Sequence, residues 1–271
     1  MSSEPQAPIA DSLSARSWRT IAFFGFTVAC AAAALLLPAL PQPVDYHGFV
    51  DDRTLLGIPH LSNVVSNLAF VLVGLAGFEV MARSRAAFTH AGERLAYYVF
   101  FVGLVLTGIG SAYYHLAPNN ETLFWDRLPM TIAFAGLVAA QVSERIAPRL
   151  GMGLLMPLLA IGAASVIYWR MTERAGAGNV LPYAILQGYT MAVVLLLALT
   201  HPSRYTRGSD IYWVFAAYLA AKVTESLDEQ IWNWTAGLVS GHTLKHLFAA
   251  LAGVIVCMTL LRRRPLATQP A

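Results

Sequence analysis

The chain has 271 residues, of which 57% are hydrophobic and only 12% are charged. An ordinary soluble domain carries roughly 25% charged residues, so this composition excludes a surface that faces water all round and predicts an integral membrane protein. The net charge of +3 comes from scattered basic residues, and no basic patch with interleaved aromatics suggests nucleic acid. The two cysteines lie inside apolar segments, which excludes a cysteine-based zinc site and suggests no disulfide framework.

Eight apolar segments are long enough to form membrane helices. They fall at 20–40, 61–82, 95–117, 122–143, 152–169, 179–200, 210–232 and 241–261. Because the connections between them are short, antiparallel neighbours in one bundle are favoured. The predicted fold class is therefore all-α, a polytopic membrane helix bundle with a seven-helix core and one extra N-terminal transmembrane helix.

The chain divides at the ends of these segments. We expect a disordered tail over 1–17, an extra membrane helix over 18–41, an outer loop over 42–60, a seven-helix domain over 61–262 and a cytoplasmic tail over 263–271. The first span could instead be a signal peptide, because basic residues precede it. The proline-rich LPALPQP that follows shows no clear cleavage signal, so an anchor helix is favoured and its role stays open.

Loop charge predicts the orientation, because cytoplasmic loops collect Lys and Arg. Basic residues gather before the first span and in alternate loops after it: Arg16, Arg19, Arg83, Arg85, Arg94, Arg145, Arg149, Arg204, Arg207, Arg262, Arg263 and Arg264. Opposite loops carry the acidic stretches at 51–53, 118–121 and 227–230, with Arg170 and Arg174 as the exception. Both termini are expected in the cytoplasm. The alanine- and arginine-rich composition favours a bacterial inner membrane, with the other end facing the periplasm.

Five polar residues stand near the outer ends of three predicted helices. Ser111 and His115 are four residues apart, as are His242 and His246, so each pair shares one helical face. Asp126 follows the APNNE turn and is expected in the first turn of the next helix. The orientation places all five at one depth in the membrane, where ionisable residues are by default functional.

Three imidazoles, a carboxylate and a hydroxyl suit a zinc hydrolase. A catalytic zinc typically has three protein ligands and an open position for water, whose pKa it lowers to roughly 7. We expect His115, His242 and His246 to bind Zn²⁺, Asp126 to accept a proton and Ser111 to stabilise an oxyanion. Each residue also has a structural alternative: interhelical hydrogen bonds for the histidines, an interfacial ion pair for Asp126, and a bond to a backbone carbonyl for Ser111.

The remaining histidines test this interpretation. His90 and His201 fall in predicted cytoplasmic loops, a membrane thickness of ~30 Å away, and cannot join the site. His47 and His60 fall in the outer loop and compete as ligands. They rank below the three chosen residues because a loop holds a ligand less rigidly.

The order SxxxH, then Asp, then a C-terminal HxxxH resembles the alkaline ceramidase family. That family belongs to a superfamily of seven-helix membrane hydrolases that includes the adiponectin receptors and lipid-remodelling proteins of GPI anchors. The resemblance covers about 61–262 and is richest at NVVSNL (63–68), GSAYYH (110–115), LFWDRLPMTI (123–132) and GHTLKH (241–246).

The resemblance implies a function and a site. It implies a zinc-dependent amidase that cleaves ceramide or a ceramide-like N-acyl lipid to a sphingoid base and a fatty acid. The zinc ligands would be His115, His242 and His246, and the catalytic residues Asp126 and Ser111. It also implies that the seven helices surround a cavity open to the bilayer, so that a membrane lipid enters sideways.

Two departures from the family matter. Eukaryotic members carry a calcium site in an acidic segment before their first helix. Here that segment is DYHGFVDDRTLLGIPH, whose acids do not fall at matching spacings. Asp51 and Asp52 are candidate Ca²⁺ ligands, or equally a solvated loop paired with Arg53, so calcium is left open. The second departure is the extra span at 20–40.

Two further residues are candidate substrate contacts. Glu225 is three residues from Lys222, so a pair across one turn is the default, since an unpaired charge at that depth is costly. A headgroup contact is the alternative. Trp125 fits an interfacial aromatic belt, with a place in the cavity wall as the alternative.

Two other functions remain in view. The same zinc, water and carboxylate would hydrolyse another membrane lipid ester, as a phospholipase does. The second alternative is a non-enzymatic receptor or transporter with a structural metal. Direct ligation of the metal by Asp126 would close the metal site and favour this alternative. No internal repeat of the transporter kind is visible. The sequence leaves open the acyl and sphingoid specificity and the oligomeric state.

Overall fold

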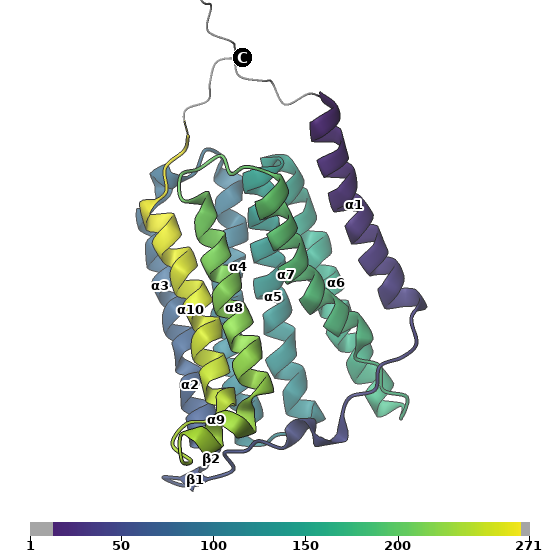
Figure 1. The fold of residues 1–271 in the computed structure, drawn as a ribbon, viewed down its shortest axis with the longest axis vertical. Coiled ribbons are helices and arrows are strands. Elements are labelled where there is room, and N and C mark those ends of the chain that lie inside the picture. Colours follow the sequence, from purple (N-terminus) through teal and green to yellow (C-terminus); the bar gives the residue numbers. More distant parts are fainter. Residues whose placement is uncertain (1–12, 267–271) are drawn as a thin grey trace, which may run out of the picture.

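The computed structural model describes residues 13–266, which form a bundle of helices running along one axis (Figure 1). Helices dominate because backbone groups inside a bilayer must bond within their own segment. The long helices are α1 (Leu13–Leu36), α3 (Leu68–Arg83), α4 (Ala91–Leu116), α5 (Asn120–Arg145), α6 (Pro148–Arg174), α7 (Leu181–Thr200), α8 (Ile211–Ser226) and α10 (Gly241–Arg262). The short elements are η1 (Val44–His47), the antiparallel hairpin β1 (Thr54–Leu55) and β2 (Ile58–Pro59), α2 (Leu61–Ser66), η2 (Arg85–Ala87), η3 (Gly208–Asp210) and α9 (Asp228–Trp234).

The prediction of a nearly all-α multi-pass membrane bundle with an N-terminal extra helix is confirmed. Within the described residues, seven helices are long and apolar enough to cross a membrane: α1, α2 continued by α3, α4, α5, α6, α7 and α10. The remaining predicted span, 210–232, is wrong as one continuous helix. It consists of α8, with 16 residues, and α9, with a break at Leu227.

The break after α8 has a physical reason at the start of α10. At 1.5 Å per residue α8 is about 24 Å long, which is shorter than the hydrocarbon core. The turn at Leu227 brings the carboxylate of Asp228 to the backbone N–H of His242 (2.7 Å). One of the unpaired N–H groups at the start of α10 is thereby satisfied.

The ends of the chain differ from the sequence prediction in two respects. The tail predicted over 1–17 is helical from Leu13 onward, and its first 12 residues lie outside the described part, as do residues 267–271 of the predicted C-terminal tail. The first helix ends at Leu36, earlier than predicted, because Pro38 disfavours helical backbone in the residue before it.

Six helices form a closed ring around the centre of the bundle. In order of contact they are α3, α4, α5, α7, α8 and α10, with α10 returning to α3. Helix α6 packs against α5 and α7, and α1 packs against α7 at the edge of the bundle (Figure 1). Phe26 of α1 stacks on Tyr189 of α7 with ring centroids 6.0 Å apart. The extra helix is therefore an addition to the ring rather than a part of it.

The two ends of the bundle have different roles. Helix α1 begins and α10 ends at one end, while η1, the hairpin and α9 cover the other (Figure 1). At the first end Arg263 pairs with Glu144 (Nη1–Oε2 2.9 Å), and both side chains are buried. We refer to the end covered by η1, the hairpin and α9 as the outer end.

Helices α4 and α5 approach each other closely at Gly110. Pro129 lacks an N–H and cannot bond to the carbonyl of Trp125 four residues earlier. That carbonyl oxygen faces Gly110, where an added Cβ would overlap it. The close approach places Ser111, the next residue, beside α5.

We predict that Gly110→Ala destabilises the protein by about 1–3 kcal/mol, because the new methyl group must push the two helix backbones apart. Thermal unfolding in detergent measures the change. Gly153→Ala on α6 is the matched control, since a Cβ there meets nothing within 4 Å and a helical Gly→Ala change is otherwise neutral or stabilising. A melting temperature for Gly110→Ala equal to that of the control would contradict this packing.

Candidate metal centre and polar cavity

Three buried histidines meet at the outer end of the bundle. His115 is the last but one residue of α4, and His242 and His246 lie in the first two turns of α10. One ligand atom from each ring lies within 4.8 Å of the other two, and the ring centroids are 4.9–5.0 Å apart. The structure thus brings together the three histidines singled out by their spacing.

The start of α10 is fixed by three contacts. The Ser240 hydroxyl accepts the N–H of Thr243 (3.1 Å), a typical N-cap. The Asp228 carboxylate accepts the N–H of His242. Gly241 lies so close to the Thr224 carbonyl that no side chain fits between them. Both histidines of α10 are therefore held on a rigid helix start.

The hydrogen bonds of His246 leave one ring nitrogen free for a metal. The Ser66 hydroxyl donates to the Asn63 carbonyl (2.9 Å) and contacts Nδ1 of His246 (2.7 Å). Since that hydroxyl proton is already used, Nδ1–H of His246 is the donor, and Nε2 keeps its lone pair. This Nε2 is buried without a hydrogen-bond partner, as is Nδ1 of His115. Unpartnered imidazole nitrogens on rings that lie this close together fit a metal ion.

The third ring, that of His242, contacts a charged neighbour. Its Nε2 lies 2.9 Å from Nζ of Lys245, one turn further along α10. Lys245 also donates to Glu225 (3.0 Å). Among residues 13–266 these three histidines are the group whose ligand atoms are close enough to share an ion. Asp126 lies outside that group, so the histidines are the protein ligands that this arrangement would offer to a metal.

The segment before α2, residues 42–60, lies over the histidines, and we refer to it as the cover. Phe49 lies over two of them, with ring centroids 4.7 Å from both His115 and His242. His60 contacts the His115 carbonyl oxygen through Nδ1 (3.1 Å). His47 contacts the Tyr114 hydroxyl through Nδ1 (3.0 Å). The two competing histidines are thus part of this cover and lie outside the metal-ligand group.

The candidate calcium ligands have other surroundings. Asp51 is buried and binds Arg53 through both carboxylate oxygens (2.7 and 2.9 Å). Burial raises the pKa of Asp51, but hydrogen bonds from Arg53 and Ser62 outweigh it and hold the pKa below its usual value. Arg53 donates in turn to the Gly237 carbonyl (2.9 Å), and Asp52 is exposed. The pair anchors the cover, and calcium gains no support from this geometry.

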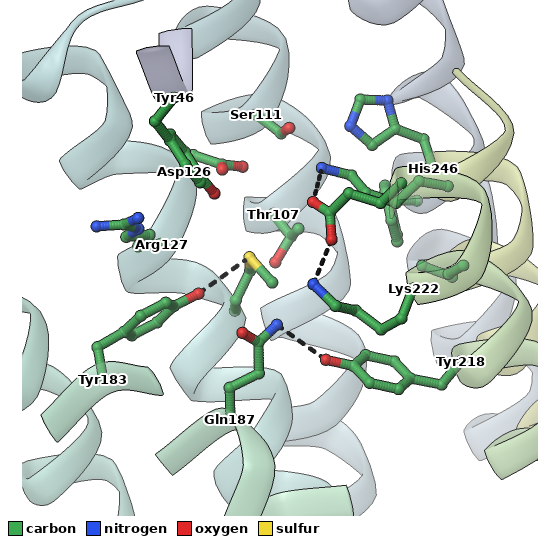
Figure 2. Close-up of a pocket in the computed structure, with 16 residues that line it drawn as sticks. Tyr46, Thr107, Ser111, Asp126, Arg127, Tyr183, Gln187, Tyr218, Lys222 and His246 are labelled. Carbon is green, nitrogen blue, oxygen red and sulfur yellow. Dashed lines mark hydrogen bonds and ion pairs between the residues drawn. The ribbon is translucent and has the colours of Figure 1, made fainter. Parts of the chain in front are cut away.

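A polar cavity of about 90 Å³ adjoins the histidines. Figure 2 shows its walls, which come from the six helices of the ring and from Tyr46 of η1. Ser111, Asp126 and His246 all line it, and Ser111 contacts the Asp126 carboxylate. Asp126 lies in the second turn of α5 rather than the first, because Asn119 caps the helix earlier than predicted.

The two candidate substrate contacts lie in different places. Glu225 lines the cavity and accepts hydrogen bonds from both Lys222 and Lys245, so the predicted pair with Lys222 is present. Trp125 is 53% exposed and lies over a separate surface hollow beside Arg170 and Arg174.

Sequence reasoning missed three residues of this cavity wall. Lys245 stands inside the GHTLKH motif, and a charge within an apolar span was a signal that could have found it. Arg127 was seen only as a neighbour of Asp126. Tyr46 comes from a loop whose packing the sequence does not indicate.

We predict that Ser66→Ala lowers the affinity for Zn²⁺ by about 10–100-fold, because His246 loses the partner that fixes its tautomer and ring orientation. Competition with a chelator on the purified protein measures this. Ser165→Ala is the control, since that buried hydroxyl donates to the Gly162 carbonyl on α6.

His242→Ala combined with His246→Ala should remove the metal. An unchanged affinity in Ser66→Ala contradicts the tautomer, and a metal-loaded double variant contradicts the site.

Comparison with known proteins agrees with this architecture. A family model described as Ceramidase matches residues 57–269, which begins just before α2, includes α10 and leaves α1 outside. A search of individually curated proteins found no significant match. The matched region contains all six helices of the ring, the three histidines, Ser111 and Asp126. The chain therefore belongs to the Ceramidase family and carries α1 in addition to the matched domain.

Proposed function

We propose that the protein is a zinc-dependent lipid amidase that hydrolyses ceramide or a ceramide-like N-acyl lipid to a sphingoid base and a fatty acid. The observation that carries the proposal is a cluster of three buried histidines inside a membrane bundle, one of which, His246, lines the same cavity as Asp126 and Ser111. Membership of the Ceramidase family supports a hydrolase that acts on amide bonds.

The three imidazoles are a ligand set typical of catalytic zinc, so His115, His242 and His246 would hold the ion. When bound, Zn²⁺ would supply Lewis acidity toward the amide carbonyl and toward water. Asp126, outside the ligand group, accepts the proton of the attacking water and returns it to the leaving amine nitrogen. Ser111 donates a hydrogen bond to the carbonyl oxygen as negative charge develops there.

The surroundings suit a lipid substrate. A second, apolar cavity adjoins the polar one and shares five wall residues with it: Phe70, Thr107, Met130, Tyr218 and Ala249. Its remaining walls are mainly aliphatic and aromatic side chains of the ring helices. An acyl chain fits such a lining, because burial of apolar surface favours it. The histidines are buried beneath Phe49, which limits the access of bulk water to the reacting end.

The placement in the cell is part of the same proposal. The alanine- and arginine-rich composition favours a bacterial inner membrane, and the loop charges favour both termini in the cytoplasm. The outer end of the bundle, with the histidines, then lies toward the periplasm. A ligand set of three histidines without Asp126 is typical of catalytic zinc, whereas structural zinc has four protein ligands, which argues against a receptor with a structural metal.

We predict that Asp126→Asn retains the metal and lowers kcat by about 10²–10⁴-fold, since the side chain of asparagine cannot accept the proton of the attacking water. Metal analysis alongside ceramide hydrolysis measures both effects. Asp52→Asn, an exposed acid in the cover, is the matched control and should keep full activity. Full activity in Asp126→Asn would remove this residue from the mechanism.

The substrate bond is tested by incubating purified protein with ceramides and phospholipids and identifying the released products by mass spectrometry. Release of fatty acid and sphingoid base from ceramide is expected. Release of fatty acid from phospholipid alone would replace the amidase with an ester hydrolase.

A further inference from the structure

Arg127 is a buried cation that no carboxylate of the described chain binds directly. It lies on α5 and is 4% exposed. The carboxylate of Asp126 attracts it through space, but among residues 13–266 the only side chain that accepts a hydrogen bond from it is the neutral Gln42. Its guanidinium carbon lies 4.3 Å from the ring centroid of Trp169 and 5.1 Å from those of Tyr46 and Tyr183. The aromatic faces offset part of the desolvation of the charge. A buried charge at membrane depth nevertheless calls for a partner.

Donors without a hydrogen-bond partner lie on this guanidinium and on two side chains that contact it. Nη2 of Arg127 donates to Oε1 of Gln42 (2.7 Å). Nε and Nη1 of Arg127, Nε2 of Gln42 and Nε1 of Trp169 are all buried and have no hydrogen-bond partner. All four are donors. A water molecule would bring two hydrogens that need acceptors of their own, whereas an anion supplies acceptors only.

The position of Arg127 connects these donors to the candidate active site. Arg127 lines the same cavity as Ser111, Asp126 and His246. In Figure 2, Arg127 and Tyr183 lie on one side of the cavity, and Lys222 and His246 lie on the other. A lipid whose scissile bond lies between Asp126 and the histidines can therefore extend another polar group to Arg127.

The charges of the cavity wall favour an anion. Three cations line it, Arg127, Lys222 and Lys245, against two carboxylates, Asp126 and Glu225. Glu225 already binds both lysines, and Asp126 contacts Ser111. The guanidinium keeps two buried N–H groups, Nε and Nη1, without a hydrogen-bond partner, and its planar fork matches a phosphate or carboxylate in a bidentate manner.

We propose that Arg127, positioned by Gln42 and Trp169, binds an anionic oxygen group, a phosphate, sulfonate or carboxylate, on the headgroup of the lipid substrate. The assignment of that group to a substrate rests on the proposed function. The preferred substrate is then an acidic N-acyl lipid rather than a neutral ceramide.

The test measures binding rather than turnover. Thermal unfolding of the full-length, metal-loaded protein in detergent is followed with a short-chain ceramide 1-phosphate, the matching neutral ceramide and inorganic phosphate. The phosphorylated lipid is expected to bind about 10–100-fold more tightly than the neutral one, as charge-assisted hydrogen bonds to a buried group require. Equal binding of the two lipids would overturn the subsite. Inorganic phosphate binding as tightly as the phosphorylated lipid would assign the site to a free anion and overturn it too.

Gln42→Glu places a carboxylate against Arg127 in the position of the missing anion. We expect this variant to melt at a higher temperature without ligand and to lose the preference for the phosphorylated lipid to within about twofold, because the buried ion pair now occupies the donors. The control is Gln141→Glu, since Gln141 also accepts from a buried arginine, Arg145 (2.9 Å), at the opposite end of the bundle. It should keep the preference. A Gln42→Glu protein that retains the full preference contradicts the proposal.

The outcome separates the subsite from the proposed function. A protein that prefers the phosphorylated lipid through Arg127 but hydrolyses neither lipid supports the subsite and overturns the amidase. A protein that hydrolyses neutral ceramide and binds both lipids equally overturns the subsite alone.

Discussion

The need of every buried polar group for a partner organises this molecule. Inside a bundle that excludes water, a donor or acceptor without a protein partner cannot form a hydrogen bond to solvent instead. Arg145 illustrates a satisfied case, with bonds to Gln141 and to the carbonyls of His201 and Gly208. At the outer end, ring nitrogens of His115 and His246 and two nitrogens of Arg127 have no hydrogen-bond partner. The first group suits a cation and the second an anion.

Close backbone contacts set the geometry of both groups. Gly110 and Gly241 each stand one residue before a site residue, Ser111 and His242, and each faces a backbone carbonyl of a neighbouring helix. Contacts between backbones have no flexible side chain to relax them, so the spacing of the helices is fixed within narrow limits. A site placed on rigid helices in this way keeps its side chains in register.

Much of the histidine cluster could be predicted from the sequence, because helical periodicity decides which residues share a face. The i, i+4 spacings of Ser111 with His115 and of His242 with His246 fix two faces, and loop charge puts both at one end. The break at Leu227 could not be predicted, since it depends on the contact between Asp228 and the backbone N–H of His242, 14 positions after Asp228. The packing of the cover depends on equally distant contacts, such as His47 with Tyr114.

Arg127 shows where local reasoning fails. Its neighbour Asp126 suggested an ion pair, but consecutive residues on a helix point about 100° apart. The guanidinium instead meets Gln42, 85 residues away in the sequence, and aromatic rings from α6, α7 and η1. Only the three-dimensional arrangement reveals that the charge is buried and that its remaining donors lack acceptors.

One stretch of chain joins the two groups. Gln42 and Tyr46 contact Arg127, and Phe49, a few residues further on, lies over His115 and His242. The bond from Arg53 to the Gly237 carbonyl ties this stretch to the connection before α10. Displacement of the segment would therefore expose the histidines and strip Arg127 of its hydrogen bond in the same movement. Exclusion of water from the histidines and pre-organisation of the guanidinium thus share one structural requirement, an ordered segment over residues 42–53.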